Sequence, residues 1–428
     1  MRIIIVGAYG LLGGYVTTRL LADGHSVVGV GRDIVVAKRR FPAARWVQAD
    51  LRTTGQAEWA ALLRNVDAVV NCAGALQDSP RDDLHAVHVK AVTDLAAACQ
   101  AAGVRRFIQI SAVGVERGAG QFQRTKQAAD EVLQAADLDW IILRPGLVLA
   151  PAAYGGSALL RGLAAFPIFI PALFPESTVQ IVSVEDVAEA VARSLQAKET
   201  RFVCDVVAAE QTRLADVLLA MRGWLGMSSA KLVAAPRWLG ALSAVIADGL
   251  GLLGWRSPMR TAALEQLAAG VTGHAEDTPA RLGFMPRGLA EALMRWPTGV
   301  HERWFARLYF LKPLALATLA VFWATSGVIG LMNRSGAVSI LVKAGVASRT
   351  AFALVVAGSL IDVTLAGLAC RRGTARLALR AMVLVTVIYL AGATLWLPQL
   401  WVDPLGPLVK SIPAAVLALV ALAILEER

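Results

Sequence analysis

The hydrophobic positions of the first 150 residues follow two alternating patterns. Short apolar runs, typical of buried strands, are separated by longer segments in which apolar residues recur every three or four positions, as in a helix. The predicted strands are residues 2–6, 26–30, 45–48, 67–71, 106–110 and 139–143. Helices are predicted between them, as at residues 11–22 and 87–102. Strands that alternate with helices build a parallel sheet, so we expect an α/β fold with a doubly wound parallel sheet.

The last quarter of the chain has a different pattern, with four long apolar stretches. They lie at about residues 313–332, 350–370, 381–397 and 407–425. A helix needs roughly 20 apolar residues to cross the hydrocarbon of a bilayer. The third stretch is short, but Trp396 and Trp401 near its end are typical of a membrane interface. We therefore expect an α-helical bundle with four transmembrane spans.

A segment with neither pattern connects these regions. Residues 236–256 are mostly apolar but are interrupted by Asp248 and several glycines, which favours an amphipathic or interfacial helix. The residues that follow mix basic and aromatic side chains, as a segment approaching a membrane surface does. We therefore divide the chain into an N-terminal domain (1–235), an interfacial connector (236–310) and a transmembrane domain (311–428).

Composition and charge also indicate a membrane protein. Hydrophobic residues make up 56% of the 428 residues, and the mean hydropathy is +0.57. The formal charge is +10, and basic residues gather at the ends of the apolar stretches, which disfavours nucleic-acid binding. They lie before the first stretch, at Arg303, Arg307 and Lys312, and between the second and third, at Arg371, Arg372, Arg376 and Arg380.

The positive-inside rule turns this placement into an orientation. The two basic groups share one side of a four-span bundle, and we expect that side to be cytoplasmic. Arg334, Lys343 and Arg349, between the first two stretches, weaken the charge asymmetry. We expect a multi-pass protein of the inner (cytoplasmic) membrane with its N-terminal domain in the cytoplasm.

A glycine motif directly follows the first predicted strand. Gly7, Gly10 and Gly13 are separated by pairs of residues, and glycine permits a tight turn and a close approach of the backbone to a pyrophosphate. The helix that follows directs unpaired N–H groups at that phosphate. The motif predicts a Rossmann-type dinucleotide site, with a plain glycine turn as the alternative. Around the cofactor we also expect Ala8, Tyr9, Leu11 and Leu12.

The ends of the next strands supply further candidate cofactor residues. Arg32 follows the second strand, where a guanidinium suits the 2′-phosphate of NADP(H), and the adjacent Asp33 leaves NAD(H) as the alternative. After the third strand, Asp50 suits the adenine amino group and Leu51 the adenine ring. Small residues after the fourth strand, Cys72, Ala73 and Gly74, leave room for the cofactor. The scattered cysteines and histidines predict no metal site.

Together these features resemble the extended and atypical short-chain dehydrogenase/reductase superfamily over about residues 1–225. The matching segments are the glycine motif, Asp50-Leu51, Asn71–Gly74, Ser111, Arg144-Pro145-Gly146 and Val184–Val187. The chain is most similar to the NmrA-like group and to the dehydrogenase-like accessory subunit of respiratory complex I. The C-terminal stretches resemble the DoxX-like membrane module. The resemblance implies that Pro145 and Gly146 contact the cofactor, and that Ser111 and Lys126 act both at the cofactor and in catalysis.

One position departs from the family pattern. The family uses a tyrosine and, four residues later, a lysine on one helix. Here Lys126 is present, but Phe122 replaces the tyrosine and has no hydroxyl. One interpretation is an oxidoreductase acting on a lipophilic or quinone-like acceptor without that tyrosine, with Tyr154 as a candidate substrate contact. The other is a non-catalytic NADP(H)-binding structural, assembly or redox-sensing subunit with a membrane protein partner.

A carboxylate lies within the second predicted span. On insertion scales, a carboxylate such as Asp362 costs roughly 2.5–3.5 kcal/mol at the centre of a span, so we expect it to face the bundle interior. It is interpreted either as a proton relay or quinone ligand, or as a structural hydrogen bond to Ser359, Thr364 or a neighbouring helix. Lys410 is a candidate partner.

Overall fold

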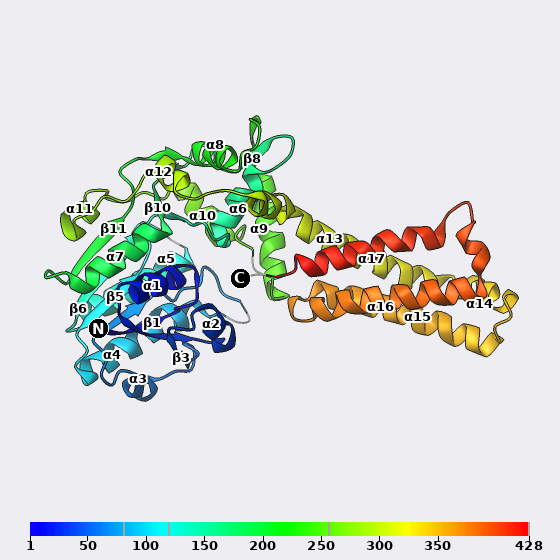
Figure 1. Cartoon of the computed structure of the whole chain (residues 1–428), viewed down its shortest axis with the longest axis horizontal. Coiled ribbons are helices and arrows are strands. Elements are labelled where there is room, and N and C mark those ends of the chain that lie inside the picture. Colours follow the sequence, from blue (N-terminus) through cyan, green and yellow to red (C-terminus); the bar gives the residue numbers. More distant parts are fainter. Residues whose placement is uncertain (80–81, 119, 256, 427–428) are drawn as a thin grey trace. The chain divides into compact units, whose positions relative to one another are not determined.

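The computed structural model describes residues 1–79, 82–118, 120–255 and 257–426. They form two compact units. The first comprises Met1–Asp248 and Ser257–Ala306, and the second comprises Gly249–Arg256 and Arg307–Arg428. The first unit combines a sheet with helices, whereas the second consists of long helices (Figure 1).

A seven-stranded sheet forms the centre of the first unit (Figure 1). Its spatial order is β11-β6-β5-β4-β1-β2-β3. The strands are β1 (Arg2–Val6), β2 (Ser26–Gly31), β3 (Arg45–Gln48), β4 (Ala68–Asn71), β5 (Arg106–Ile110), β6 (Asp139–Pro145) and β11 (Phe202–Val206). All neighbouring strands run parallel, so their carboxyl ends meet at one edge. This confirms the predicted doubly wound parallel sheet.

Helices cover both faces of the sheet because successive strand residues point to opposite faces. Ile3 belongs to the same buried cluster as Val16 and Val187, whereas the next residue, Ile4, is buried with Leu95 in a second cluster. The first cluster includes residues of α1 (Leu11–Ala22), α2 (Ile34–Arg40) and α7 (Val184–Gln196). The second includes residues of α3 (Gln56–Leu62), α4 (Ala91–Ala102) and α5 (Gln121–Ala135).

Short elements form a third hydrophobic cluster in the first unit. Three two-stranded sheets pair β7 (Leu147–Leu149) with β10 (Ile181–Ser183), β8 (Ile170–Ala172) with β13 (Leu232–Ala234), and β9 (Thr178–Val179) with β12 (Thr212–Arg213). The remaining helices before the long apolar ones are η1 (His85–Lys90), α6 (Gly155–Ala164), α8 (Leu214–Trp224), α9 (Arg237–Leu252), α10 (Thr261–Ala269), α11 (Asp277–Leu282) and α12 (Leu289–Met294). The segment expected to be an interfacial connector therefore contains α9 to α12.

The second unit is helical, and the first of its long helices, α13, begins within the last residues of the first unit. The helices are α13 (Val300–Met332), α14 (Arg334–Lys343), α15 (Ser348–Cys370), α16 (Arg372–Trp396) and α17 (Pro407–Ala423), with the short η2 (Pro398–Trp401) before α17. Of these, α13, α15 and α16 are long and apolar enough to cross a membrane. The fourth expected span corresponds to α17, which has only 17 residues, so the predicted count of four spans is not confirmed.

The basic residues between the second and third predicted spans do not form a loop. Because α15 ends at Cys370 and α16 begins at Arg372, Arg371 alone separates the two helices. Arg376 and Arg380 lie on α16, which is therefore longer than the predicted third span. An arginine can lay its aliphatic stem along a helix and hold its charge at the interface. A pattern search that counts only apolar residues therefore starts such a helix too late.

Candidate functional site

The predicted site residues meet at the carboxyl edge of the parallel sheet. Gly7 follows β1, Arg32 follows β2, Cys72 follows β4 and Ser111 follows β5. Pro145 is the last residue of β6. Ligands of open parallel sheets bind outside the carboxyl ends of the strands. The sheet topology thus gathers residues that lie far apart in the sequence.

The turn after β1 has space only for glycine. A Cβ on Gly7, whose φ is +74°, would lie 2.9 Å from the amide nitrogen of Ala73. A Cβ on Gly13 would lie 2.2 Å from the carbonyl oxygen of Gly7. The amide of Gly10 donates to the same carbonyl at 3.0 Å. Helix α1 can pack this closely on the turn because position 13 has no side chain.

The first turn of α1 presents amide groups suited to an anion. The N-cap residue, Gly10, has no side chain with which to cap the helix, and the first N–H groups of a helix lack acceptors within it. Leu11 and Leu12 occupy this turn and are half-buried, whereas Ala8 is fully buried. A diphosphate would meet amide donors and the positive end of the helix dipole here. The residues present therefore fit a dinucleotide.

Tyr9 lies against the end of β2. A Cβ on Gly31 would lie 2.2 Å from Cε1 of the Tyr9 ring. The Tyr9 hydroxyl accepts a hydrogen bond from the N–H of Asp33 at 3.2 Å. The Asp33 carboxylate accepts from the N–H of Val36 at 3.3 Å and thereby caps α2. This carboxylate is thus engaged in the helix cap.

Charged side chains follow β2 and β3. Arg32 Nη2 is 2.7 Å from Asp82 Oδ1, and Arg52 Nη2 is 2.6 Å from Asp50 Oδ2. The hydrogen bond from Arg52 holds the pKa of Asp50 below its ordinary value, and the charge of Arg32 lowers it further. Leu51 packs against the second core cluster. A bound phosphate here would compete with carboxylates for the two guanidinium groups.

The chain leaves β4 through three small residues. Asn71 is buried, donates to Gln109 Oε1 at 2.9 Å and accepts from the N–H of Ala73 at 3.1 Å. These bonds fix the turn that contains Cys72 and leads to Gly74. Burial raises the pKa of the Cys72 thiol to about 12, so the thiol is neutral.

Lys126 and Ser111 are both buried at this edge. The Lys126 ammonium donates to the carbonyl oxygen of Ile110 at 2.9 Å and lies 3.4 Å from the position of a Cβ on Gly74. Burial lowers the pKa of Lys126 to about 8, although the nearby Asp130 opposes this shift. The Ser111 hydroxyl donates to Asp130 Oδ2 at 2.9 Å.

Asp130 is a site residue that sequence reasoning missed. It lies on α5, four residues after Lys126, and is 1% exposed. Arg144 Nη2 is 3.1 Å from its Oδ2, while Oδ1 has no hydrogen-bond partner within the described parts of the chain. Burial raises the pKa of Asp130, and the charge of Arg144 opposes this. Its spacing from Lys126, which places both on one helix face, was the available sequence signal.

Phe122 packs beside a histidine. Its ring and that of His88 are 5.7 Å apart in an edge arrangement. His88 Nδ1 is 2.8 Å from Thr125 Oγ1, and Nε2 accepts from the N–H of Ala75 at 3.1 Å. Burial lowers the pKa of His88 to about 2, with a further contribution from the charge of Lys126. His88 is therefore neutral, and it holds the segment after β4 against α5.

The segment after β6 contains the last predicted residues. A Cβ on Gly146 would lie 2.4 Å from the carbonyl oxygen of Gln180, so this close approach requires glycine. Pro145, which precedes it, is buried. Tyr154 is the N-cap residue of α6 and is 36% exposed.

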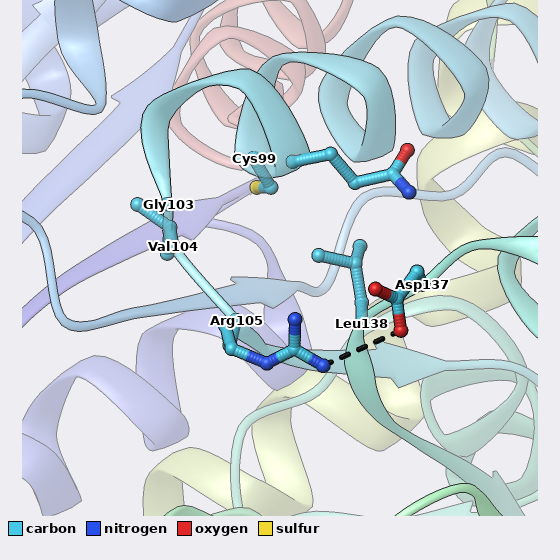
Figure 2. A pocket seen from close by; sticks show the side chains of 7 residues that line it. Cys99, Gly103, Val104, Arg105, Asp137 and Leu138 are labelled. Carbon is cyan, nitrogen blue, oxygen red and sulfur yellow. Dashed lines mark hydrogen bonds and ion pairs between the residues drawn. The ribbon is translucent and has the colours of Figure 1, made fainter.

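Two cavities lie away from the carboxyl edge. One of about 190 Å³ lies near the amino ends of β5 and β6, and is lined by residues such as Cys99, Arg105 and Asp137 (Figure 2). The other, of about 670 Å³, is lined by α1, α7 and residues before and after α12, including Arg19 and Trp296. Neither is lined by a predicted cofactor residue.

In the second unit, Asp362 joins three helices. Its Oδ2 accepts from the Ser326 hydroxyl of α13 at 2.8 Å, and its Oδ1 accepts from the Tyr389 hydroxyl of α16 at 3.0 Å. The side chain is buried, as expected. These two hydrogen-bond donors, Ser326 and Tyr389, lie on neighbouring helices, and the suggested partner Lys410 is not among the donors described.

The parallel sheet and the glycine turn define a Rossmann-type NAD(P)-binding domain. Residues 7–198 match the model of a family described as NAD(P)H-binding, and residues 320–419 match the model of the DoxX-like family. The chain therefore joins an NAD(P)H-binding domain to a DoxX-like domain. This confirms the architecture that the sequence resemblance implied, and it indicates a multi-pass membrane protein.

Two curated relatives each match less than half of the chain. A ceramide reductase of Caulobacter vibrioides is 27% identical over 187 residues, which is 44% of this chain and 58% of the relative. An uncharacterized protein of Mycobacterium tuberculosis is 28% identical over 198 residues, or 46% of this chain and 20% of the relative. The chain thus spans less than two thirds of the length of either relative.

Solved structures share the fold at low sequence identity. A UDP-glucuronic acid 4-epimerase of Bacillus cereus, solved with UDP-glucuronic acid and NAD, has a TM-score of 0.53 and 16% identity over 73% of this chain and 100% of its own. A dTDP-glucose 4,6-dehydratase of Bacillus anthracis, solved with NAD, has a TM-score of 0.52 and 14% identity over 69% of this chain and 96% of its own. These likenesses establish the fold alone.

Proposed function

We propose that the protein is an NADP(H)-dependent oxidoreductase of the inner membrane that acts on a lipophilic or quinone-like acceptor from the cytoplasmic side. The observation that supports this most is the site at the carboxyl edge of the sheet. A glycine cradle for a dinucleotide and the buried Lys126 occur together there, in a chain with membrane-spanning helices. A bound nicotinamide cofactor would supply a hydride.

We favour NADP(H) over NAD(H) because of the side chains after β2 and β3. Arg32 and Arg52 place two guanidinium groups there, and a 2′-phosphate is recognised by such groups. The Asp33 carboxylate, which would otherwise suit a ribose hydroxyl, caps α2. Direct comparison of NADPH and NADH affinities tests this preference.

Lys126 is the proposed proton donor in place of the missing tyrosine. With a pKa of about 8, it is mostly protonated at neutral pH, and a general acid works best when its pKa lies near the working pH. Reduction of a quinone requires one hydride and one further proton. The Lys126 ammonium would give that proton to the acceptor oxygen and regain one from water. Phe122 has no proton to give, and His88 is neutral with both ring nitrogens engaged.

A lipophilic acceptor is supported by two observations. Three helices of the second unit are suited to a bilayer, which is useful to an enzyme whose substrate is dissolved there. The Caulobacter relative is a ceramide reductase, and ceramide is a membrane lipid. We therefore propose a reducible lipid or quinone as the acceptor.

The test uses the full chain in a mild detergent. NADPH binding is measured first, and NADPH oxidation is then followed with a quinone analogue or a long-chain keto lipid. We expect oxidation that Lys126→Met abolishes and that the matched surface variant Lys198→Met retains, because Lys198 is exposed. Tight NADPH binding with no oxidation by any lipophilic acceptor would contradict the enzymatic proposal.

A non-catalytic role is the second candidate, and one observation favours it. The Ser111 hydroxyl donates to Asp130 and the Lys126 ammonium donates to Ile110, so both groups have partners within the protein. A structural, assembly or redox-sensing subunit of this kind would retain NADPH without turnover. It would also copurify with a membrane protein partner.

A further inference from the structure

Helix α9 buries its small residues and exposes its large apolar residues, unlike a typical surface helix. Its buried residues are small and recur on one face, as Gly240, Ala244 and Ala247 do. A Cβ on Gly240 would lie 2.8 Å from Cδ2 of Leu173, so this face is packed closely on the first unit. The opposite face carries the large side chains of the helix.

That opposite face is exposed and entirely apolar. Trp238 and Val245 are each 67% exposed, and Leu242 is 49% exposed. Leu239 and Ile246 extend the same face. A helix facing water normally has polar residues on its outer side, and a contiguous exposed apolar patch marks an interaction surface.

The length of α9 and the contacts of the residues that follow it indicate the partner of this face. With 16 residues, α9 is about 24 Å long at 1.5 Å per residue, which is too short to cross a bilayer. Within the second unit, the segment after α9 is bound where α15 gives way to α16. The amide of Arg372 donates to the Leu253 carbonyl at 3.1 Å, and the Trp255 indole donates to the Cys370 carbonyl at 2.6 Å. The exposed face is therefore continuous in the chain with a segment fixed at the ends of two membrane-spanning helices.

We propose that the apolar face of α9 lies in the lipid bilayer at the boundary between headgroups and acyl chains. Interfacial helices bury their apolar face to this shallow depth. Trp238 lies in the first turn of the helix and Trp255 follows its last residue, and tryptophan is enriched at such interfaces. This inference is independent of the proposed chemistry, because it concerns a surface and its lipid partner.

The same helix is linked to the candidate site through Asp248. The Gln77 side chain donates to Asp248 Oδ1 at 2.9 Å, and the Thr261 hydroxyl donates to Oδ2 at 2.7 Å. Gln77 lies three residues after Gly74, on the segment that leaves β4. The lipid-facing helix therefore helps to hold a segment that begins at the site.

The experiment measures the depth of single nitroxide labels on the full chain in phosphatidylcholine–phosphatidylglycerol nanodiscs. The labelled variants are made in a chain that carries Cys370→Ser. This substitution keeps the bond to Trp255, because the indole of Trp255 donates to the backbone carbonyl of Cys370 and not to its thiol. Leu242→Cys and Val245→Cys are the tested positions. Glu131→Cys, on the exposed side of α5, is the water control, and Leu384→Cys, 61% exposed on α16, is the lipid control.

We expect the labels on α9 to collide with dissolved oxygen and to lose collisions with a water-soluble nickel chelate, as the label at position 384 does. Nickel collisions as frequent as those at position 131 would overturn the proposal. Exclusion of both reagents would also overturn it, since the face would then be covered by protein, such as a second copy of the chain.

Discussion

Replacing Gly13 by alanine tests the glycine cradle most directly. The new Cβ would lie 2.2 Å from the carbonyl oxygen of Gly7 and 2.9 Å from the Cα of Ala8. The first distance is more than 1 Å short of the 3.4 Å at which ordinary contact begins. Because both neighbours are backbone atoms, no side chain can rotate away, and either the turn or α1 must move.

The expected cost is that of overpacking, about 1–3 kcal/mol. For a domain of 150–250 residues, each kcal/mol lowers Tm by about 2–4 °C, so a loss of several degrees is expected. The same movement displaces the amide groups of the first turn of α1. A loss of about 1.4 kcal/mol in contacts to the diphosphate weakens the Kd for NADPH about tenfold.

The assay compares Gly13→Ala with Gly223→Ala in NADPH titrations and thermal unfolding. Gly223 lies within α8, is exposed and has no atom within 4 Å of its Cβ position. Its replacement should leave binding unchanged and stabilise the helix by up to about 1 kcal/mol. The reasoning fails if Gly13→Ala binds NADPH as tightly as the native chain and unfolds at the same temperature as Gly223→Ala.

Three further predictions test other parts of the structure. Phe122→Tyr places a hydroxyl four residues before Lys126, and we expect it to increase NADPH oxidation by a lipophilic ketone. An unchanged rate would contradict the idea that residues 122 and 126 occupy the positions of the tyrosine and lysine in the family that the sequence resembles. In the native chain, oxidation should decline as pH rises through about 8, where the Lys126 ammonium loses its proton. Lys126→Arg should abolish oxidation at every pH, because arginine keeps its proton and cannot donate it to the acceptor, and oxidation that persists with the same decline would assign that decline to another group. Asp362→Leu leaves the Ser326 and Tyr389 hydroxyls without their shared acceptor, so we expect the second unit to lose about 0.6–2 kcal/mol of stability. Asp362→Asn should cause a smaller loss. Thermal unfolding in detergent measures the stability of both variants.

The sheet could be predicted from the sequence because its signals are local. The run Ile3-Ile4-Ile5 is apolar on both faces, as a central parallel strand requires, and Gly7 and Gly13 mark the turn that follows. The topology then places every strand end at one edge without any knowledge of side-chain contacts. These features needed only the order of residues within short segments.

The supports of the site could not be predicted in this way, because they depend on contacts between distant segments. Nothing near His88 in the sequence indicates that it meets Thr125 and Phe122 across η1 and α5. Asp130 becomes a site residue only when β5 and β6 bring Ser111 and Arg144 beside it. Helix α9 shows the same limit, since its composition indicated an interfacial segment but only the fold separates its small buried face from its large exposed one.

Phe122 stands where the family that the sequence resembles has a tyrosine, and this difference bears on Lys126. A tyrosine hydroxyl beside Lys126 would offer the ammonium a polar neighbour, whereas Phe122 places an apolar ring on the same helix face. An apolar, buried environment disfavours the charged form of a lysine, and the pKa of Lys126 is lowered to about 8. Burial thus leaves Lys126 as an acid whose proton is available near neutral pH. In the mechanism that we propose, Lys126 takes the place of the tyrosine as the acid, so the phenylalanine should not be taken as evidence that the site is inactive.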